Sequence, residues 1–175
     1  SFEDKGIQTV LANLEDSVKN LSRAIEGADR LCVTAGSGGD SGLDKTLLID
    51  LDGAVKMMEA AEKAGIKRFI LVSALQANNR ENWSDEIKPY YVAKHYADRI
   101  LENSPLTYTI IRPGGLLNEA GTGKIQVGEM VTSGTIPRED VARTILASFT
   151  NESTYNRSFD LISGEFSIEE ALNKL

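Results

Sequence analysis

The sequence has one cysteine, one histidine and four prolines among its 175 residues. A single thiol, Cys32, excludes a disulfide within the chain, and a single imidazole, His95, argues against a histidine-based metal site. No apolar run approaches the ~20 residues that a membrane-spanning helix needs, and no signal peptide is visible. These absences predict a cytoplasmic protein without a metal centre and without a membrane partner.

Basic residues are fewer than acidic ones, 19 against 26, which gives a net charge of -7. A nucleic-acid surface needs a basic face, so this balance argues against a nucleic-acid partner. The chain is 41% hydrophobic and 26% charged, as in an ordinary globular domain, and 175 residues suffice for one real core. We therefore expect a single domain over residues 1–175 that acts on a small molecule as a monomer or homodimer.

Apolar runs predict strands at 6–11, 30–35, 68–74, 107–112 and 158–162. Amphipathic stretches predict helices at 14–26, 45–64, 90–103 and 137–149, and a short helix capped by Ser167. Asn13 or Asp16 is expected to cap the first helix, and Leu47 and Leu48 are expected on the apolar stripe of the second. Residues 114–131 are predicted to be irregular. The alternation predicts an α/β fold, a doubly wound parallel sheet covered on both faces.

Tyr90 and Lys94 stand four residues apart in a predicted helix, so their side chains lie on one face. A neighbouring cation favours the phenolate, so we expect Lys94 to lower the pKa of Tyr90 from about 10. Such a tyrosine can exchange a proton at a carbonyl or carbinol oxygen, which Ser73 at a strand end could hold. Alternatives remain: the pair could be a solvated helix face, Tyr91 could compete, and the Ser73 hydroxyl could bond to the backbone.

Five segments carry a resemblance to a known family. They are AGIKRFILVSA (64–74), YYVAKHYAD (90–98), YTIIRPGGL (108–116), IPREDVA (136–142) and SGEFSIEEAL (163–172). In this order they resemble the atypical short-chain dehydrogenase/reductase group with NmrA-like NAD(P)-binding domains. The resemblance implies a Rossmann-like fold and an NADP cofactor, with NAD as the other possibility.

The resemblance also implies an activity. It assigns Ser73, Tyr90 and Lys94 as catalytic residues of an oxidoreductase that reduces a small carbonyl, quinone or similar acceptor, with Lys94 also holding the nicotinamide ribose. The alternative within the NmrA-like branch is an NAD(P)-binding redox sensor or regulatory protein without turnover.

Three segments are candidate cofactor contacts by the same resemblance. Loop 36–42 follows a strand, but its glycine spacing fits neither Gly-x-Gly-x-x-Gly nor a Walker loop. The resemblance places the cofactor's adenosine and ribose against Ala35, Gly36, Ser37 and Gly38, its adenine near Asn13 and Leu14, and its carboxamide near Pro113, Gly114 and Gly115. A flexible turn, a helix cap and a strand end are the structural alternatives. Arg112 is expected in a structural ion pair, and Arg138 and Asp140 in a structural helix start.

The family's Gly-x-x-Gly-x-x-Gly fingerprint belongs to a first strand-turn-helix unit that we do not find in this sequence. We therefore expect the first strand-helix-strand to be missing, so that the strand at 6–11 corresponds to the third strand of the family order 3-2-1-4-5-6-7. Neighbouring strands lie about 4.8 Å apart, so the gap beside that strand would be roughly 14 Å wide. The serine at position 1 agrees with this expectation of an N-terminally incomplete chain.

Overall fold

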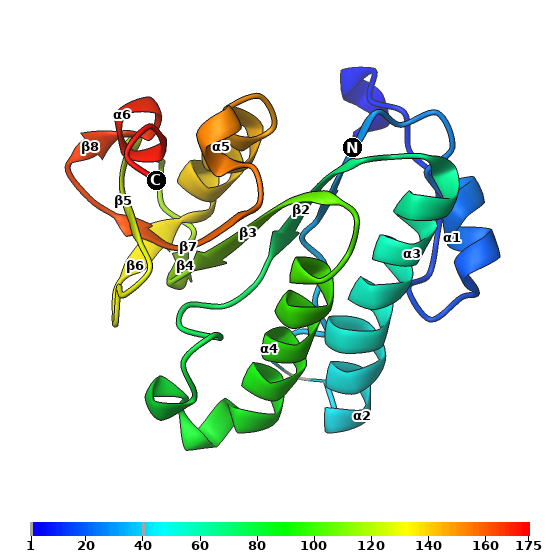
Figure 1. Cartoon of the computed structure of the whole chain (residues 1–175), viewed down its shortest axis with the longest axis horizontal. Coiled ribbons are helices and arrows are strands. Elements are labelled where there is room, and N and C mark those ends of the chain that lie inside the picture. Colours follow the sequence, from blue (N-terminus) through cyan, green and yellow to red (C-terminus); the bar gives the residue numbers. More distant parts are fainter. Residues whose placement is uncertain (1, 40) are drawn as a thin grey trace.

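A computed structural model describes residues 2–39 and 41–175. Its centre is a six-stranded sheet in the order β1-β2-β3-β7-β5-β8 (Figure 1). The parallel strands are β1 (Arg30–Val33), β2 (Arg68–Val72), β3 (Thr107–Pro113) and β7 (Arg157–Ser163). Two strands extend one edge in antiparallel pairing, β5 (Lys124–Gly128) and β8 (Phe166–Ser167). The predicted α/β fold with a mostly parallel sheet is confirmed.

Helices cover both faces of this sheet. One face carries α1 (Val18–Ala24), α3 (Ala54–Ala64) and α4 (Lys88–Glu102), and the other carries α5 (Arg138–Ser148) and α6 (Ile168–Leu172). Successive residues of β2 alternate between the two cores, because side chains along a strand point to opposite faces. Phe69 and Leu71 pack into the first core and Ile70 into the second, and all three are fully buried. This double burial explains why the strands are continuous apolar runs.

The helix expected at 45–64 departs from its predicted apolar stripe. It begins as α2 (Leu43–Lys45), passes into a π-helical segment η2 (Thr46–Gly53), and continues as α3. Leu47 and Leu48 are 54% and 41% exposed, whereas the buried residues of η2 are Thr46, Asp50 and Gly53. The inner side of η2 lies against α4, and its buried face is partly polar.

The strand expected at 6–11 is wrong. Residues 7–13 adopt no regular secondary structure, and Leu11 is fully exposed. A strand needs a hydrogen-bonded neighbour, and among the residues described β1 is an edge strand that pairs only with β2. The cap of α1 is Ser17, whose hydroxyl accepts from the N–H of Asn20, while Asn13 closes a turn by accepting from Glu15 N–H.

Residues 114–131 are more regular than predicted. Besides β5 they contain β4 (Gly115–Leu117), which pairs in parallel with β6 (Thr135–Pro137). Gly114 lies against the backbone carbonyl of Gly134, so closely that a Cβ at position 114 would collide with it. A glycine is therefore required at the exit of β3 by backbone packing.

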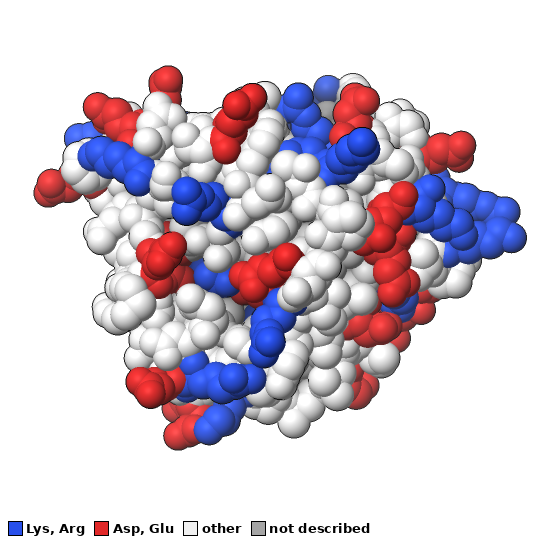
Figure 2. All heavy atoms as spheres, in the orientation of Figure 1, with Lys and Arg blue, Asp and Glu red and all other residues white. Residues whose placement is uncertain are grey.

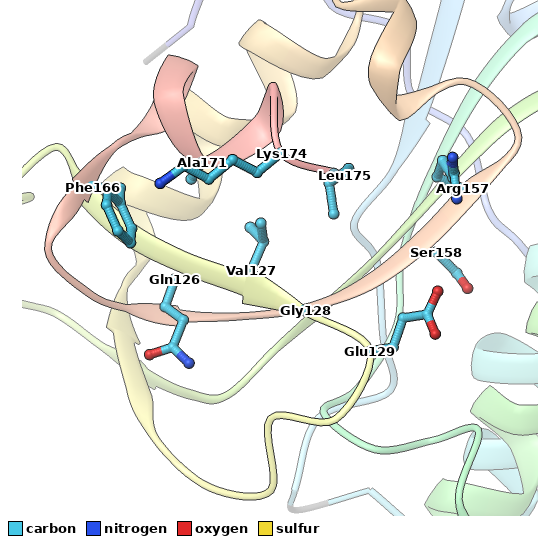
Figure 3. A pocket seen from close by; sticks show the side chains of 10 residues that line it. All are labelled: Gln126, Val127, Gly128, Glu129, Arg157, Ser158, Phe166, Ala171, Lys174 and Leu175. Carbon is cyan, nitrogen blue, oxygen red and sulfur yellow. The ribbon is translucent and has the colours of Figure 1, made fainter.

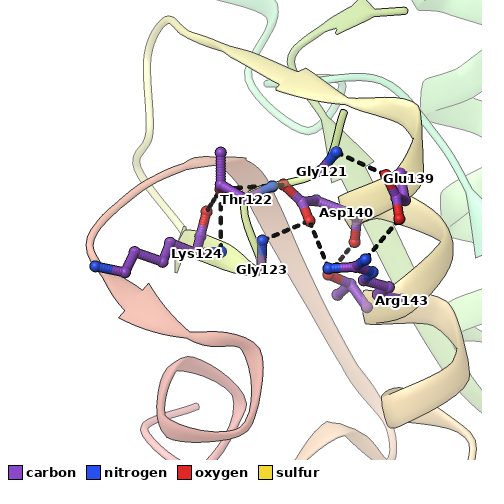
Figure 4. A network of polar contacts seen from close by, with 8 residues as sticks. Gly121, Thr122, Gly123, Lys124, Glu139, Asp140 and Arg143 are labelled. Atoms are coloured by element: carbon purple, nitrogen blue, oxygen red, sulfur yellow. Dashed lines mark hydrogen bonds and ion pairs between the residues drawn. The ribbon is translucent and has the colours of Figure 1, made fainter. Parts of the chain in front are cut away.

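The first turn of α5 fixes the loop before β5 (Figure 4). The fully buried carboxylate of Asp140 accepts hydrogen bonds from the N–H groups of Thr122 and Gly123, both at 2.8 Å. Glu139 accepts from Gly121 N–H at 2.7 Å. These contacts confirm the structural role predicted for Asp140.

Short 3-10 helices complete the fold: η1 (Glu3–Lys5), η3 (Arg80–Asn82), η4 (Asp85–Ile87) and η5 (Glu152–Thr154). On the face in Figure 2, acidic and basic side chains are interspersed, and the described residues form no broad basic patch there. Within 2–39 and 41–175, no helix has the length and apolar character needed to cross a membrane.

Replacing Asp140 by alanine is expected to lower the free energy of unfolding by about 3 kcal/mol, because two backbone N–H groups lose a charged, fully buried acceptor. Glu139→Ala is the matched control, since its carboxylate is 47% exposed, and should cost about 1 kcal/mol or less. Urea unfolding of both variants measures the difference. Equal losses would contradict the assignment.

Candidate functional site

A cavity of about 740 Å³ opens where three parallel strands end. The residues at these strand ends line the cavity. Thr34 follows β1, Val72 is the last residue of β2, Ser73 follows β2, and Pro113 is the last residue of β3. The loop after β1, η2, η4 and the first turns of α4 supply the remaining walls. Open α/β sheets bind ligands at this edge, so the cavity is the candidate site.

Most of the predicted site residues meet in this cavity. The predicted catalytic residues Ser73, Tyr90 and Lys94 all line it. The predicted cofactor contacts that line it are Ala35, Gly36, Ser37, Gly38 and Pro113. The structure therefore brings the two chemical parts of the sequence prediction, proton transfer and cofactor contact, into one space.

Four predicted cofactor contacts do not line the cavity: Asn13, Leu14, Gly114 and Gly115. Leu14 packs on the first core beside Gly53, and Asn13 is exposed in its turn. Gly114 is required by packing, as described above, and Gly115 pairs with Thr135 of β6. In this structure their positions are explained by packing, turn geometry and strand pairing.

Lys94 is buried beneath the end of β2. Its side chain projects from α4, the residue is 2% exposed, and its ammonium donates a hydrogen bond to the carbonyl of Val72 at 2.8 Å. Burial lowers the pKa of Lys94, and the carboxylates of Asp50 and Asp98 act in the opposite direction. A buried cation is thus flanked by two acids, as desolvated charges require.

Tyr90 lies one helical turn before Lys94, but its pKa moves in the direction opposite to the prediction. Burial raises the pKa of Tyr90 to about 12, and the nearby Asp50 carboxylate adds to the rise. The expected lowering by Lys94 is wrong for this structure, because burial and negative charge dominate around the phenol. Tyr90 is therefore a neutral phenol at neutral pH, a proton donor in its resting form.

Tyr91 is not a competing site residue. Its ring stacks on Trp83, with centroids 5.8 Å apart and an interplanar angle of 9°. The indole N–H of Trp83 donates to the carbonyl of Gln76 at 3.2 Å, which anchors the stack on the loop before α4. Tyr91 does not line the cavity, which leaves Tyr90 as the tyrosine of the site.

The Ser73 hydroxyl is buried and makes no hydrogen bond to a backbone group of the described residues, so it is not a backbone-bonded strand end. Ser73 acts on the neighbouring carboxyl of Asp98. Burial raises the pKa of Asp98, and Arg112 and Ser73 lower it. Asp98 also accepts from Arg112 Nε at 2.9 Å, and both side chains are almost fully buried. The ion pair predicted for Arg112 is confirmed.

Sequence reasoning missed Asp50, which is 1% exposed and lines the cavity from η2. Its Oδ2 accepts from the N–H and the hydroxyl of Ser37, at 3.1 and 2.6 Å. The available signal was the spacing of Thr46, Asp50 and Gly53, which puts these residues on one helix face while leucines lie on the other. Arg138, assigned only to a helix start, also lines the cavity and donates to Asn118 at 3.0 Å.

A second cavity, of about 400 Å³, lies between β5, β7 and α6 (Figure 3). Lys174 lies over the ring of Phe166 at its rim, with its ammonium 3.2 Å from the ring centroid. None of the predicted site residues lines this cavity. We therefore place the candidate site in the larger one.

Comparison with known proteins shows the family to which the chain belongs. Residues 1–152 match a family described as NAD(P)H-binding. The chain is 60% identical over 175 residues to a Bacillus subtilis (strain 168) protein named "Uncharacterized sugar epimerase YhfK", covering 100% of this chain and 82% of that protein.

Two solved structures are also similar. The oxidoreductase ylbE from Lactococcus lactis is 36% identical, with a TM-score of 0.88 over 96% of this chain and 77% of that one. ChuY from Escherichia coli O157:H7, described as an anaerobillin reductase, is 26% identical, with a TM-score of 0.77 over 95% and 80%. The chain therefore belongs to the NAD(P)H-binding family, among Rossmann-like proteins described as oxidoreductases, reductases and epimerases.

Proposed function

We propose that the protein is an NAD(P)-dependent oxidoreductase that reduces a carbonyl, quinone or similar acceptor. The observation that carries this proposal is the convergence, in one strand-end cavity, of Tyr90 as a protonated phenol, Lys94 as a buried amine and Ser73 as a buried hydroxyl. Family membership supplies the cofactor class, and NADP is proposed over NAD.

The chemistry of the cavity supports such a cofactor. Lys94 uses one hydrogen-bond donor on Val72 and has three, so donors remain for ligand hydroxyls. The loop 35–38 and Pro113 provide strand-end backbone for a nucleotide. When bound, a reduced nicotinamide supplies the hydride that the acceptor carbon receives.

The chain itself supplies the proton. Tyr90 O–H donates to the acceptor oxygen as that oxygen gains negative charge, and the Ser73 hydroxyl donates to the same oxygen and orients it. The remaining phenolate regains a proton from solvent. Because its pKa is raised, Tyr90 is protonated before each turnover.

The mouth of the cavity favours an apolar acceptor. Leu43, Ile87 and Leu116, from three different elements, line it and are 64%, 48% and 41% exposed. Exposed leucines and isoleucines gain free energy when an apolar ligand covers them. This supports an acceptor with an extended hydrophobic part next to its reducible group.

Tyr90→Phe is expected to keep NADPH affinity and to lower the reduction rate by about 100-fold or more, because only the proton donor is removed. Tyr91→Phe is the matched control and should reduce the acceptor at the wild-type rate, since its ring stacks outside the cavity. Fluorescence titration with NADPH and NADH, followed by turnover on a panel of carbonyls and quinones, measures both properties. Cofactor binding without turnover in any form would instead support a redox sensor.

Leu116→Asp is expected to raise the KM for a hydrophobic quinone by about tenfold while changing kcat much less, because it alters the mouth and not the proton donor. Leu146→Asp, on α5 and 69% exposed away from the cavity, is the control. An unchanged KM for Leu116→Asp would place the acceptor elsewhere.

A further inference from the structure

One buried carboxylate of the cavity has no contact with the ligand in the proposed reaction. Asp50 is 1% exposed, lines the cavity and acts electrostatically on both Tyr90 and Lys94. Its Oδ2 is held by Ser37, but its Oδ1 has no hydrogen-bond partner in the described part of the chain. An unpaired buried carboxylate oxygen is costly, so its place on a ligand cavity indicates a hydrogen-bond donor on the ligand.

The loop after β1 is shaped around this carboxylate. Ser37 directs both its N–H and its hydroxyl to Asp50, so neither donor points to a ligand phosphate. A Cβ at Gly36 would lie 2.9 Å from Asp50 Oδ1, so a glycine allows the carboxylate to approach the backbone. A negative charge at this point disfavours a phosphate and favours neutral groups that donate hydrogen bonds.

Lys94 offers the complementary half of such a site. Its ammonium lines the same cavity and has donors left after its bond to Val72, whereas Asp50 has a free acceptor. A hydroxyl both donates and accepts, so the two adjacent hydroxyls of a sugar can satisfy a carboxylate and an ammonium together.

We propose that Asp50 is a binding residue for a sugar diol, with Oδ1 accepting from one hydroxyl while Lys94 donates to the diol. The inference rests on the proposed function in taking that sugar as the nicotinamide ribose of the cofactor, because the adenosine ribose of NADP carries a 2′-phosphate and has no free diol. It adds a recognition residue, and it leaves the N–H and the hydroxyl of Ser37 unavailable to a phosphate.

Asp50→Asn tests the proposal while keeping the shape of the side chain and an oxygen that can accept from Ser37. The Kd for NADPH is expected to rise about tenfold, because a charge-assisted hydrogen bond is lost. Asp52→Asn is the matched control: Asp52 is on the same helix, is 55% exposed and pairs with Lys56, so its loss should leave the Kd unchanged. An Asp50→Asn protein that binds NADPH like the wild type overturns the proposal.

A second measurement on the unmodified protein separates this inference from the proposed function. The amide resonance of Ser37 reports on Asp50, and it should shift when nicotinamide riboside is added, but not with its 2′,3′-dideoxy counterpart. NADPH binding with no hydroxyl-dependent shift of Ser37 overturns the role of Asp50 and leaves the function standing. A hydroxyl-dependent shift without NADPH binding supports Asp50 and overturns the function, and the absence of both overturns both.

Discussion

The ammonium of Lys94 donates to the carbonyl of Val72, and the residue is only 2% exposed. The other charged groups of the site are arranged around this buried cation. A charge removed from water must be balanced nearby or it loses its proton. Asp50 on one side and Asp98 on the other provide the balance, and they come from η2 and from α4 itself. Keeping the lysine charged therefore requires η2, the end of β2 and α4 to stay together.

The Asp98–Arg112 ion pair extends this requirement into the sheet. Asp98 lies one turn beyond Lys94 on α4, and Arg112 is on β3, so the pair joins the helix that carries Tyr90 to a central strand. Both groups are almost fully buried, and loss of either one would leave the other charge without its partner. The orientation of α4 thus depends on electrostatics as well as on apolar packing.

The sequence predicted those features that periodicity determines. Continuous apolar runs located the parallel strands, and the four-residue spacing of Tyr90 and Lys94 with a strand-end Ser73 located three residues that share the cavity. Features that depend on neighbours were not predictable in this way. The expected strand at 6–11 has no pairing partner among the described residues, and Leu47 and Leu48 are exposed because η2 turns a polar face inward.

The protonation of Tyr90 shows why a sequence pair cannot be interpreted in isolation. Considered alone, a lysine one turn away favours the phenolate, which would suit a base that removes a proton from an alcohol. In the folded chain, burial and the charge of Asp50 raise the pKa of the phenol to about 12. A protonated phenol can donate a proton, as reduction of a carbonyl requires. The direction of the proposed chemistry therefore follows from a carboxylate on η2 and from desolvation. Neither cause can be inferred from the Tyr-x-x-x-Lys spacing.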